Sequence, residues 1–259
     1  MYCFRGGGNL ELLISNFKRQ LKIYCAFTLA EILITIGIIG IIAALTIPNI
    51  LSNYRKKVVE TRLMKFYSGI NQAIQMSEKD NGPKEYWSSI GVGFATGEDG
   101  NIDKTHSLPM DWFNKYLKNY LKYTTVKVND VAGNVMVYFP DGSLCLFNEW
   151  SFQFWPEAKD YKEYGVDDNG NFTNNTQLSG IKYFTFLFLY GPNYNADSYK
   201  YHYKKGVEPY KSRWDGSPEM LKSDPTIGCR KEVTNERAYC AALIQLNGWK
   251  IPKDYPLRF

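Results

Sequence analysis

Histidine is scarce in this chain of 259 residues, and the sequence contains only His106 and His202. Zinc sites and hydrolytic triads depend on imidazole groups, so the composition argues against either kind of centre. We expect both histidines to lie on the surface. Residues 166–172 (VDDNGNF) bring oxygen ligands close together but lack the full spacing and terminal glutamate of an EF-hand, which favours a plain turn. The sequence therefore predicts no cofactor, no bound metal and no enzyme active site.

A strong excess of one charge is also missing. The formal net charge is +5, but residues 1–26 contribute +3 of it, so the rest of the chain is close to neutral. Nucleic-acid binders usually carry a basic patch or stripe on the binding domain, and the overall composition offers none. Residues 198–205 (SYKYHYKK) interleave aromatic and basic side chains, as single-strand binders do, but an edge strand protected by lysines explains this pattern more simply. We predict no nucleic-acid partner.

Cysteine is limited to five residues, and three of them, Cys145, Cys229 and Cys240, follow residue 26. Cys229 and Cys240 are close together near the C-terminus and form the natural disulfide pair in an oxidising compartment. Such a bridge should stabilise the fold by about 3 kcal/mol. Cys145 is left over, and we expect it to be a small buried hydrophobe on a strand.

One long apolar run dominates the N-terminal part of the chain. Residues 32–54 are 23 consecutive uncharged residues, enough to cross a hydrocarbon layer about 30 Å thick as a helix. A cleaved secretory signal has a shorter apolar core and ends in a small-x-small site, which fits this run poorly. The basic residues before the run favour a cytoplasmic N-terminus, although Arg55, Lys56 and Lys57 oppose that orientation from the other side. We predict a single membrane span with the body outside the cytoplasm.

The helical pattern continues beyond the apolar run. Val59, Leu63, Phe66, Ile70 and Ala73 recur at spacings of three and four residues, which indicates an amphipathic helix. The first turn signal after the span is the sequence DNGP at residues 80–83. The sequence therefore predicts one helix over about 27–78, bent at Pro48 because proline removes a backbone donor.

The remaining sequence predicts an α+β fold. Ser107 is the expected N-cap of a helix that reaches Leu121, and Thr234 or Asn235 the expected cap of a helix that ends before Gly248. Asp141-Gly142 predicts the turn of a hairpin over residues 134–147, with further strands at 152–155 and 183–190. We predict a long N-terminal helix, with a transmembrane half and an amphipathic half, packed on a C-terminal globular domain that contains an antiparallel sheet. The expected divisions are 1–26, 27–53 and 54–259.

Glu31 is the one charged residue within the apolar part of CAFTLAEILITIGIIG. An ionised carboxylate inside a bilayer costs about 3 kcal/mol on insertion scales, so it tends to mark a function. Residues 25–78 resemble the N-terminal region of type IV pilins and type II secretion pseudopilins, the class III signal peptide proteins. The resemblance implies cleavage between Ala26 and Phe27 by a prepilin peptidase, methylation of Phe27 as the new N-terminus, and a docking role for Glu31. Pro48 matches a helix-bending proline of the family, whereas Ala26 stands where the family usually has glycine, which implies slower cleavage.

The position of Glu31 also has a direct physical interpretation. Cleavage after Ala26 would create an amine about 6 Å from the carboxylate along a helix. In a bundle of apolar helices, a buried carboxylate strongly favours an opposite charge, and pairing with a neighbour's amine would set the axial register. The partners that the resemblance implies are other copies or related pilins, membrane lipid, the prepilin peptidase, and an inner-membrane assembly platform with its ATPase. The implied location is the bacterial inner membrane, followed by a periplasmic or surface filament.

Three alternatives remain open at the level of sequence. In the first, Glu31 belongs to an ordinary membrane anchor, and its side chain simply extends to the membrane interface. In the second, the body is a membrane-anchored extracytoplasmic enzyme or binding protein that does not polymerise. Cys25 also resembles a lipidation site, but Tyr24 stands where lipobox processing wants a small residue.

Overall fold

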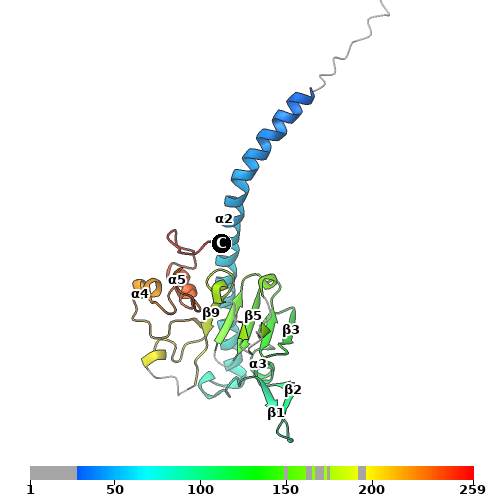
Figure 1. Cartoon of the computed structure of the whole chain (residues 1–259). Coiled ribbons are helices and arrows are strands. Elements are labelled where there is room, and N and C mark those ends of the chain that lie inside the picture. Colours follow the sequence, from blue (N-terminus) through cyan, green and yellow to red (C-terminus); the bar gives the residue numbers. More distant parts are fainter. Residues whose placement is uncertain (1–27, 149–150, 162–164, 167–171, 174–175, 192–196) are drawn as a thin grey trace, which may run out of the picture. The chain divides into compact units, whose positions relative to one another are not determined.

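The computed structural model describes residues 28–148, 151–161, 165–166, 172–173, 176–191 and 197–259 (Figure 1). The chain divides into two units, Met1–Ile50 and Leu51–Phe259. Helix α2 spans Leu29–Asn81 and contains Pro48. The expected single helix is thus present, and it ends three residues later than the pattern predicted. The α+β prediction, with a long N-terminal helix and an antiparallel sheet, is confirmed.

The second unit is built on a six-stranded antiparallel sheet with the strand order β10-β9-β6-β5-β4-β3 (Figure 1). Two small pairs, β1 with β2 and β7 with β8, lie outside this sheet. The strands are β1 (Phe94–Thr96), β2 (Ile102–Ser107), β3 (Thr125–Val128), β4 (Val135–Tyr138), β5 (Leu144–Asn148), β6 (Ser151–Trp155), β7 (Gly165–Val166), β8 (Phe172–Thr173), β9 (Phe184–Leu187) and β10 (Glu208–Pro209).

Several short helices complete the second unit. The α-helices after α2 are α3 (Leu108–Tyr116), α4 (Pro218–Ser223) and α5 (Cys240–Leu246), and the 3-10 helices include η1 (Lys84–Tyr86), η2 (Ala158–Asp160), η3 (Thr176–Leu178) and η5 (Asp197–Tyr199).

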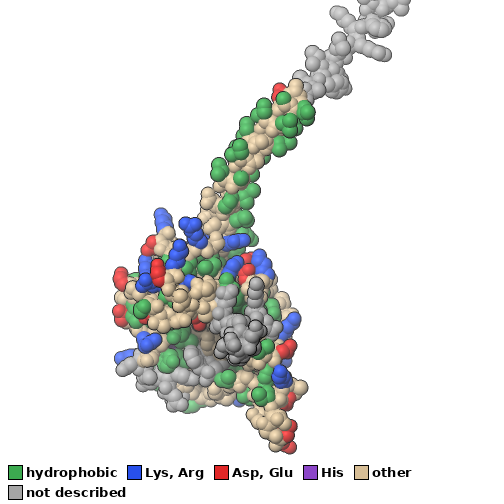
Figure 2. Space-filling model, viewed as in Figure 1, with side chains coloured by type: hydrophobic (Ala, Val, Ile, Leu, Met, Phe, Trp, Pro, Cys, Tyr) green, Lys and Arg blue, Asp and Glu red, His purple; other side chains and the backbone are tan. Residues whose placement is uncertain are grey.

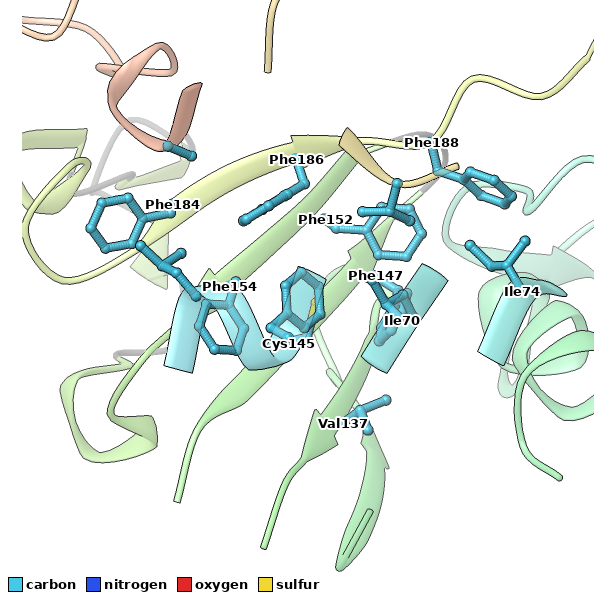
Figure 3. Close-up of a cluster of buried hydrophobic side chains, with 14 of the residues drawn as sticks. Ile70, Ile74, Val137, Cys145, Phe147, Phe152, Phe154, Phe184, Phe186 and Phe188 are labelled. Carbon is cyan, nitrogen blue, oxygen red and sulfur yellow. The ribbon is translucent and has the colours of Figure 1, made fainter. Parts of the chain in front are cut away.

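The C-terminal part of α2 packs against this sheet through one face. Val59, Leu63, Phe66, Ile70 and Ala73 are all buried, as the spacing predicted, and the same face continues through further buried positions. Figure 3 shows phenylalanines of β5, β6 and β9 gathered over Ile70 and other core residues. The Phe66 ring stacks on Phe154 at 4.4 Å between centroids. Aromatic side chains on alternating strand positions therefore form the surface on which this helix rests.

The hairpin prediction is confirmed, and so is the position of Cys145. Strands β4 and β5 pair in antiparallel register, with Tyr138 opposite Leu144 across the Asp141-Gly142 turn. Gly142 has a φ of 81°, a conformation that glycine adopts without a steric penalty. Cys145 is a free, fully buried thiol on β5, and burial raises the pKa of that thiol well above its ordinary value.

The predicted helix after Ser107 begins where expected but ends earlier. The Ser107 hydroxyl accepts a hydrogen bond from the Met110 amide at 3.2 Å, which confirms the N-cap. Helix α3 ends at Tyr116, whereas the sequence pattern extends to Leu121. Tyr120 and Leu121 still pack against the core from the turn that follows. The apolar spacing therefore predicted correctly which residues pack on the core, but it predicted a longer helix than the one observed.

The C-terminal helix is present, but its predicted cap is wrong. Helix α5 starts at Cys240 rather than after Thr234 or Asn235. The Thr234 carbonyl instead accepts hydrogen bonds from the Thr176 hydroxyl and the Gln177 amide, which keeps this segment outside the helix. Tyr239, just before α5, donates its hydroxyl proton to the Ser212 carbonyl at 2.6 Å. Tertiary hydrogen bonds therefore set the start of this helix.

The edge-strand interpretation of residues 198–205 is also wrong. Helix η5 (Asp197–Tyr199) covers the start of this segment, and turns follow it. The amide of His202 bonds to the Tyr199 carbonyl, and the amide of Lys205 bonds to the His202 carbonyl, so these backbone groups serve local turns. The edges of the main sheet are β3 and β10.

Cys229 and Cys240 form a disulfide with an S–S distance of 2.05 Å, the pair expected from their positions. Both residues are buried. We expect the double substitution Cys229→Ser, Cys240→Ser to lower the free energy of unfolding by about 3 kcal/mol, because the bridge restricts the unfolded chain. Urea unfolding of the purified second unit, with and without reductant, measures this loss in the free energy of unfolding. The double variant serves as the control, since reductant should not change its midpoint, and an equally insensitive wild type would contradict the prediction.

Candidate functional site

The first candidate site is the N-terminal end of α2. The apolar side chains of residues 29–50 face outward, and the large ones, from Leu29 to Ile50, are between 41% and 77% exposed. Figure 2 shows these side chains covering the helix surface. Among the described residues, α2 is the one helix long and apolar enough to cross a membrane, judged by length and composition. Exposed apolar surfaces of this extent are typical of membrane or protein contact sites.

Glu31 lies in the first turn of this helix and caps it. Its carboxylate accepts hydrogen bonds from the Thr28 amide and hydroxyl, both at 2.8 Å, while the Thr28 hydroxyl accepts from the Glu31 amide at 3.2 Å. This reciprocal arrangement is a capping box, which satisfies backbone donors at a helix start. This local role was not predicted from the sequence, although threonine followed three residues later by glutamate is its recognised signature.

The other predicted site residues are distributed as follows. Ala26 and Phe27, the expected processing site, lie outside the described residues, as does most of residues 166–172. Pro48 lies within α2. Glu31 and Pro48 belong to the first unit, and the Cys229–Cys240 disulfide belongs to the second.

The second candidate site is a polar cluster with three buried members, His202, Glu208 and Lys211, and it was not predicted from the sequence. We call it the Lys211 cluster: Tyr67, Tyr201, His202, Glu208, Lys211 and Gln245. Its members come from α2, the turns after η5, β10, the segment after β10, and α5. No local motif joins residues so far apart in the sequence. Interleaved aromatic and basic residues at 198–205 were the available signal, and they were read as an edge strand.

Hydrogen bonds connect the cluster. The Lys211 ammonium donates to the Tyr201 hydroxyl at 2.7 Å and to the Gln245 side-chain oxygen at 2.5 Å. Glu208 accepts from Tyr67 at 2.8 Å, from the Gln245 amide at 3.3 Å and from Tyr201 at 3.4 Å. Glu208 is 9% exposed and Lys211 4% exposed, so both charged residues are largely shielded from water.

Burial shifts the titration of this cluster. Desolvation lowers the pKa of Lys211 to about 8, although the Glu208 carboxylate acts in the opposite direction. Burial, together with Glu208, raises the pKa of Tyr201 to about 12. Groups with shifted pKa values occur at functional sites and in structural networks alike.

The surface prediction for His202 is wrong. His202 is fully buried, and its Nε2 accepts a hydrogen bond from the Lys211 amide at 2.9 Å. Burial, followed by the charges of Lys211 and Lys205, lowers the pKa of His202 to about 3. His106 is exposed, as predicted, and its Nε2 lies 2.5 Å from an Asp111 oxygen. His202 is therefore a neutral core residue.

A groove lies beside the C-terminal part of α2. Its volume is about 440 Å³, and its lining includes Phe66, Gly69 and Ile70 of α2 together with Leu121 and Phe139 from the facing turns. Small-molecule sites usually have volumes of this size. Within the described ranges, no group of three or more His, Cys, Asp or Glu side chains is arranged to hold a metal ion.

Comparison with protein-family models gives one match, to a family of unknown function (DUF6613) over residues 49–259. The chain belongs to this family. The matched DUF6613 region contains all six strands of the main sheet, the disulfide and the Lys211 cluster. Glu31 and most of the exposed apolar segment precede the matched region. No curated protein and no solved structure matches the chain.

Proposed function

We propose that this protein is a pilin-like structural subunit of a type IV pilus or a type II secretion pseudopilus. The observation that carries the proposal is the apolar segment of α2, whose side chains are exposed and whose one charged residue, Glu31, lies in the first turn. A helix of this kind suits two environments in succession, lipid before assembly and a bundle of similar helices afterwards. The carboxylate is tolerated in lipid because it lies at the membrane interface.

The hydrogen bonds of Glu31 support a docking role. Among the residues that the structure describes, Thr28 is the hydrogen-bond donor to this carboxylate, and these are short-range contacts within one helical turn. Cleavage after Ala26 would leave Thr28 as the second residue of the mature chain, so a neighbour's terminal amine would approach the same helix end. A charged partner binds a carboxylate more strongly than a neutral hydroxyl in a dry environment. Replacement of the Thr28 hydrogen bonds by an ion pair with the neighbour's amine would fix the axial register between neighbouring subunits.

The C-terminal unit would then be the extracytoplasmic body of the subunit. The Cys229–Cys240 disulfide fits an oxidising compartment. Assembly would require the partners named by the resemblance: prepilin peptidase, other pilin-like subunits, and an inner-membrane platform with its ATPase. The proposal assigns the protein no catalytic activity.

A second candidate function is that of a membrane-anchored binding protein. The groove of about 440 Å³ beside α2 favours it, because the groove combines apolar lining with Lys65, Lys122 and Asp141. A binding protein of this kind would keep its N-terminal segment and remain a single subunit in the membrane. The two functions therefore differ in processing and in assembly.

Intact-mass analysis of the protein from cells with and without a prepilin peptidase tests the proposal. We expect the mature chain to begin at Phe27 and to carry one methyl group when the peptidase is present, and to be uncut when it is absent. A strain with an inactive peptidase is the matched control for expression and purification. An uncut chain in both strains would contradict the pilin-like proposal and favour the anchored binding protein.

A further inference from the structure

Lys211 and Gln245 lie in direct contact inside the second unit. The Lys211 Nζ atom is 2.5 Å from the Gln245 side-chain oxygen, so the amine lies against the carboxamide group. The two residues are 34 positions apart, on the segment after β10 and on α5. Packing of these segments holds an amine and an amide carbonyl together without solvent between them. Such proximity can replace a large part of the entropic barrier to a reaction between two groups.

The surroundings make Lys211 easier to deprotonate than a lysine in water, because burial lowers the pKa of its ammonium group to about 8. Its hydrogen-bond acceptors, the Tyr201 hydroxyl and the Gln245 oxygen, are both uncharged, and the residue is 4% exposed. The Tyr201 ring centroid lies 4.3 Å from the Lys211 Nζ atom and the Trp214 centroid 5.1 Å from it, so the rings shield the amine from water while their faces also stabilise its charged form. A desolvated lysine loses its proton more readily than one in water, and only the neutral amine attacks a carbonyl.

Glu208 is placed to move the protons. One carboxylate oxygen accepts from the Gln245 amide nitrogen at 3.3 Å, and the same oxygen accepts from the Tyr201 hydroxyl at 3.4 Å. Tyr201 in turn accepts from Lys211, so it connects the amine to the carboxylate. The carboxylate therefore contacts the leaving nitrogen directly and the attacking nitrogen through one hydroxyl. A positioned carboxylate can act first as a general base and then as a general acid.

We propose that Lys211 and Gln245 form an intramolecular isopeptide bond, assisted by Glu208. The Lys211 amine attacks the Gln245 side-chain carbon after its extra proton passes through Tyr201 to Glu208. A new C–N bond forms, the proton held by Glu208 goes to the Gln245 amide nitrogen, and the bond from the side-chain carbon to that nitrogen breaks. The attacking nitrogen then gives up a second proton, which passes by the same route through Glu208 to the released ammonia. The products are the Lys211–Gln245 amide and one ammonium ion, with no oxidant or other co-reactant. The nitrogen and proton count is the same on both sides.

The bond would fix α5 to the segment that follows β10. The Cys229–Cys240 disulfide lies within the 34-residue interval between the two residues, so one covalent loop would contain another. A polar network without the bond would hold the same elements by hydrogen bonds alone. The two states differ in covalent mass, which makes them distinguishable without any functional assay. The inference is independent of the proposed pilin-like role.

The test is peptide mapping of the wild-type full-length chain, purified folded from its host and reduced before digestion. Trypsin should fail to cut after Lys211, and residues 206–213 should appear joined to residues 238–250, lighter than the sum of the two peptides by one ammonia. Fragmentation of the joined species should locate the link at Lys211 and Gln245. Separate peptides with free Lys211 and an intact Gln245 amide would overturn the proposal.

Variants test the chemistry. Lys211→Arg should abolish the link while keeping a hydrogen-bond donor, and Glu208→Gln should abolish it by removing the proton carrier. Lys205→Arg is the matched control, because Lys205 lies over the Tyr201 ring but is exposed, and it should retain the link. A complete link in Glu208→Gln would refute the role of Glu208. If a variant fails to fold, the wild-type peptide map still decides whether the bond exists.

Discussion

Replacing Glu31 by glutamine is expected to leave the protein in the membrane and to abolish its assembly into filaments. Glutamine keeps an oxygen that accepts hydrogen bonds from Thr28, so the capping box and the helix start survive. The substitution removes the negative charge that a neighbour's terminal amine would pair with. Membrane fractionation should show wild-type levels of Glu31→Gln, while filament preparations sheared or pelleted from the cells should contain none of it.

Two further variants separate the charge from the cap. Thr28→Ala removes the capping hydroxyl but keeps the carboxylate, and we expect it to assemble. Glu31→Ala removes both the charge and the cap, and it should fail like the glutamine variant. Filaments of Glu31→Gln at the wild-type level would contradict the docking role. In that case the carboxylate would serve only to start the helix.

Replacing Phe66 by alanine is expected to destabilise the second unit by about 3–5 kcal/mol, the usual range for a buried phenylalanine. Phe66 is 6% exposed, and its ring lies at 4.4 Å from Phe154 and 5.1 Å from Phe186, measured between centroids. Its removal would leave a cavity between α2 and the sheet. Thermal and urea unfolding of the purified body measure the change in the free energy of unfolding.

Met64→Ala is the matched control on the same helix. Met64 is 49% exposed, so its truncation should change stability by less than about 1 kcal/mol. Equal losses for Phe66→Ala and Met64→Ala would mean that this face of α2 does not carry the core. A loss below about 1 kcal/mol for Phe66→Ala would contradict the packing directly.

Local patterns predicted much of the fold. The spacing of Val59, Leu63 and Phe66 identified the buried face of α2 because a helix places such residues on one side. Asp141-Gly142 identified the β4–β5 turn because glycine readily adopts the positive φ found there. Ser107 identified the start of α3 through its hydroxyl group. In each case the interaction joins residues only a few positions apart.

Two of these errors reflect contacts made by the fold, and the third reflects local turns. The cap predicted at Thr234 failed because its carbonyl is engaged by Thr176 and Gln177, residues far away in the sequence. His202 was expected on the surface because histidine is usually polar and exposed, whereas the fold encloses it and supplies the Lys211 amide as a donor. The strand predicted at residues 198–205 failed because its backbone bonds serve local turns. A local sequence pattern does not show which competing hydrogen-bond partners a residue will meet in the fold.

The sequence by itself determined the long helix, its apolar and amphipathic parts, the single carboxylate of Glu31 and the expected cysteine pair. These features depend on residue type and on short spacing, which the chain carries in any conformation. Tertiary structure alone decided that the buried Lys211 and Glu208 meet the partly exposed Gln245 in one cluster. Their contact requires closure of long loops and removal of water, and both depend on how the whole body packs.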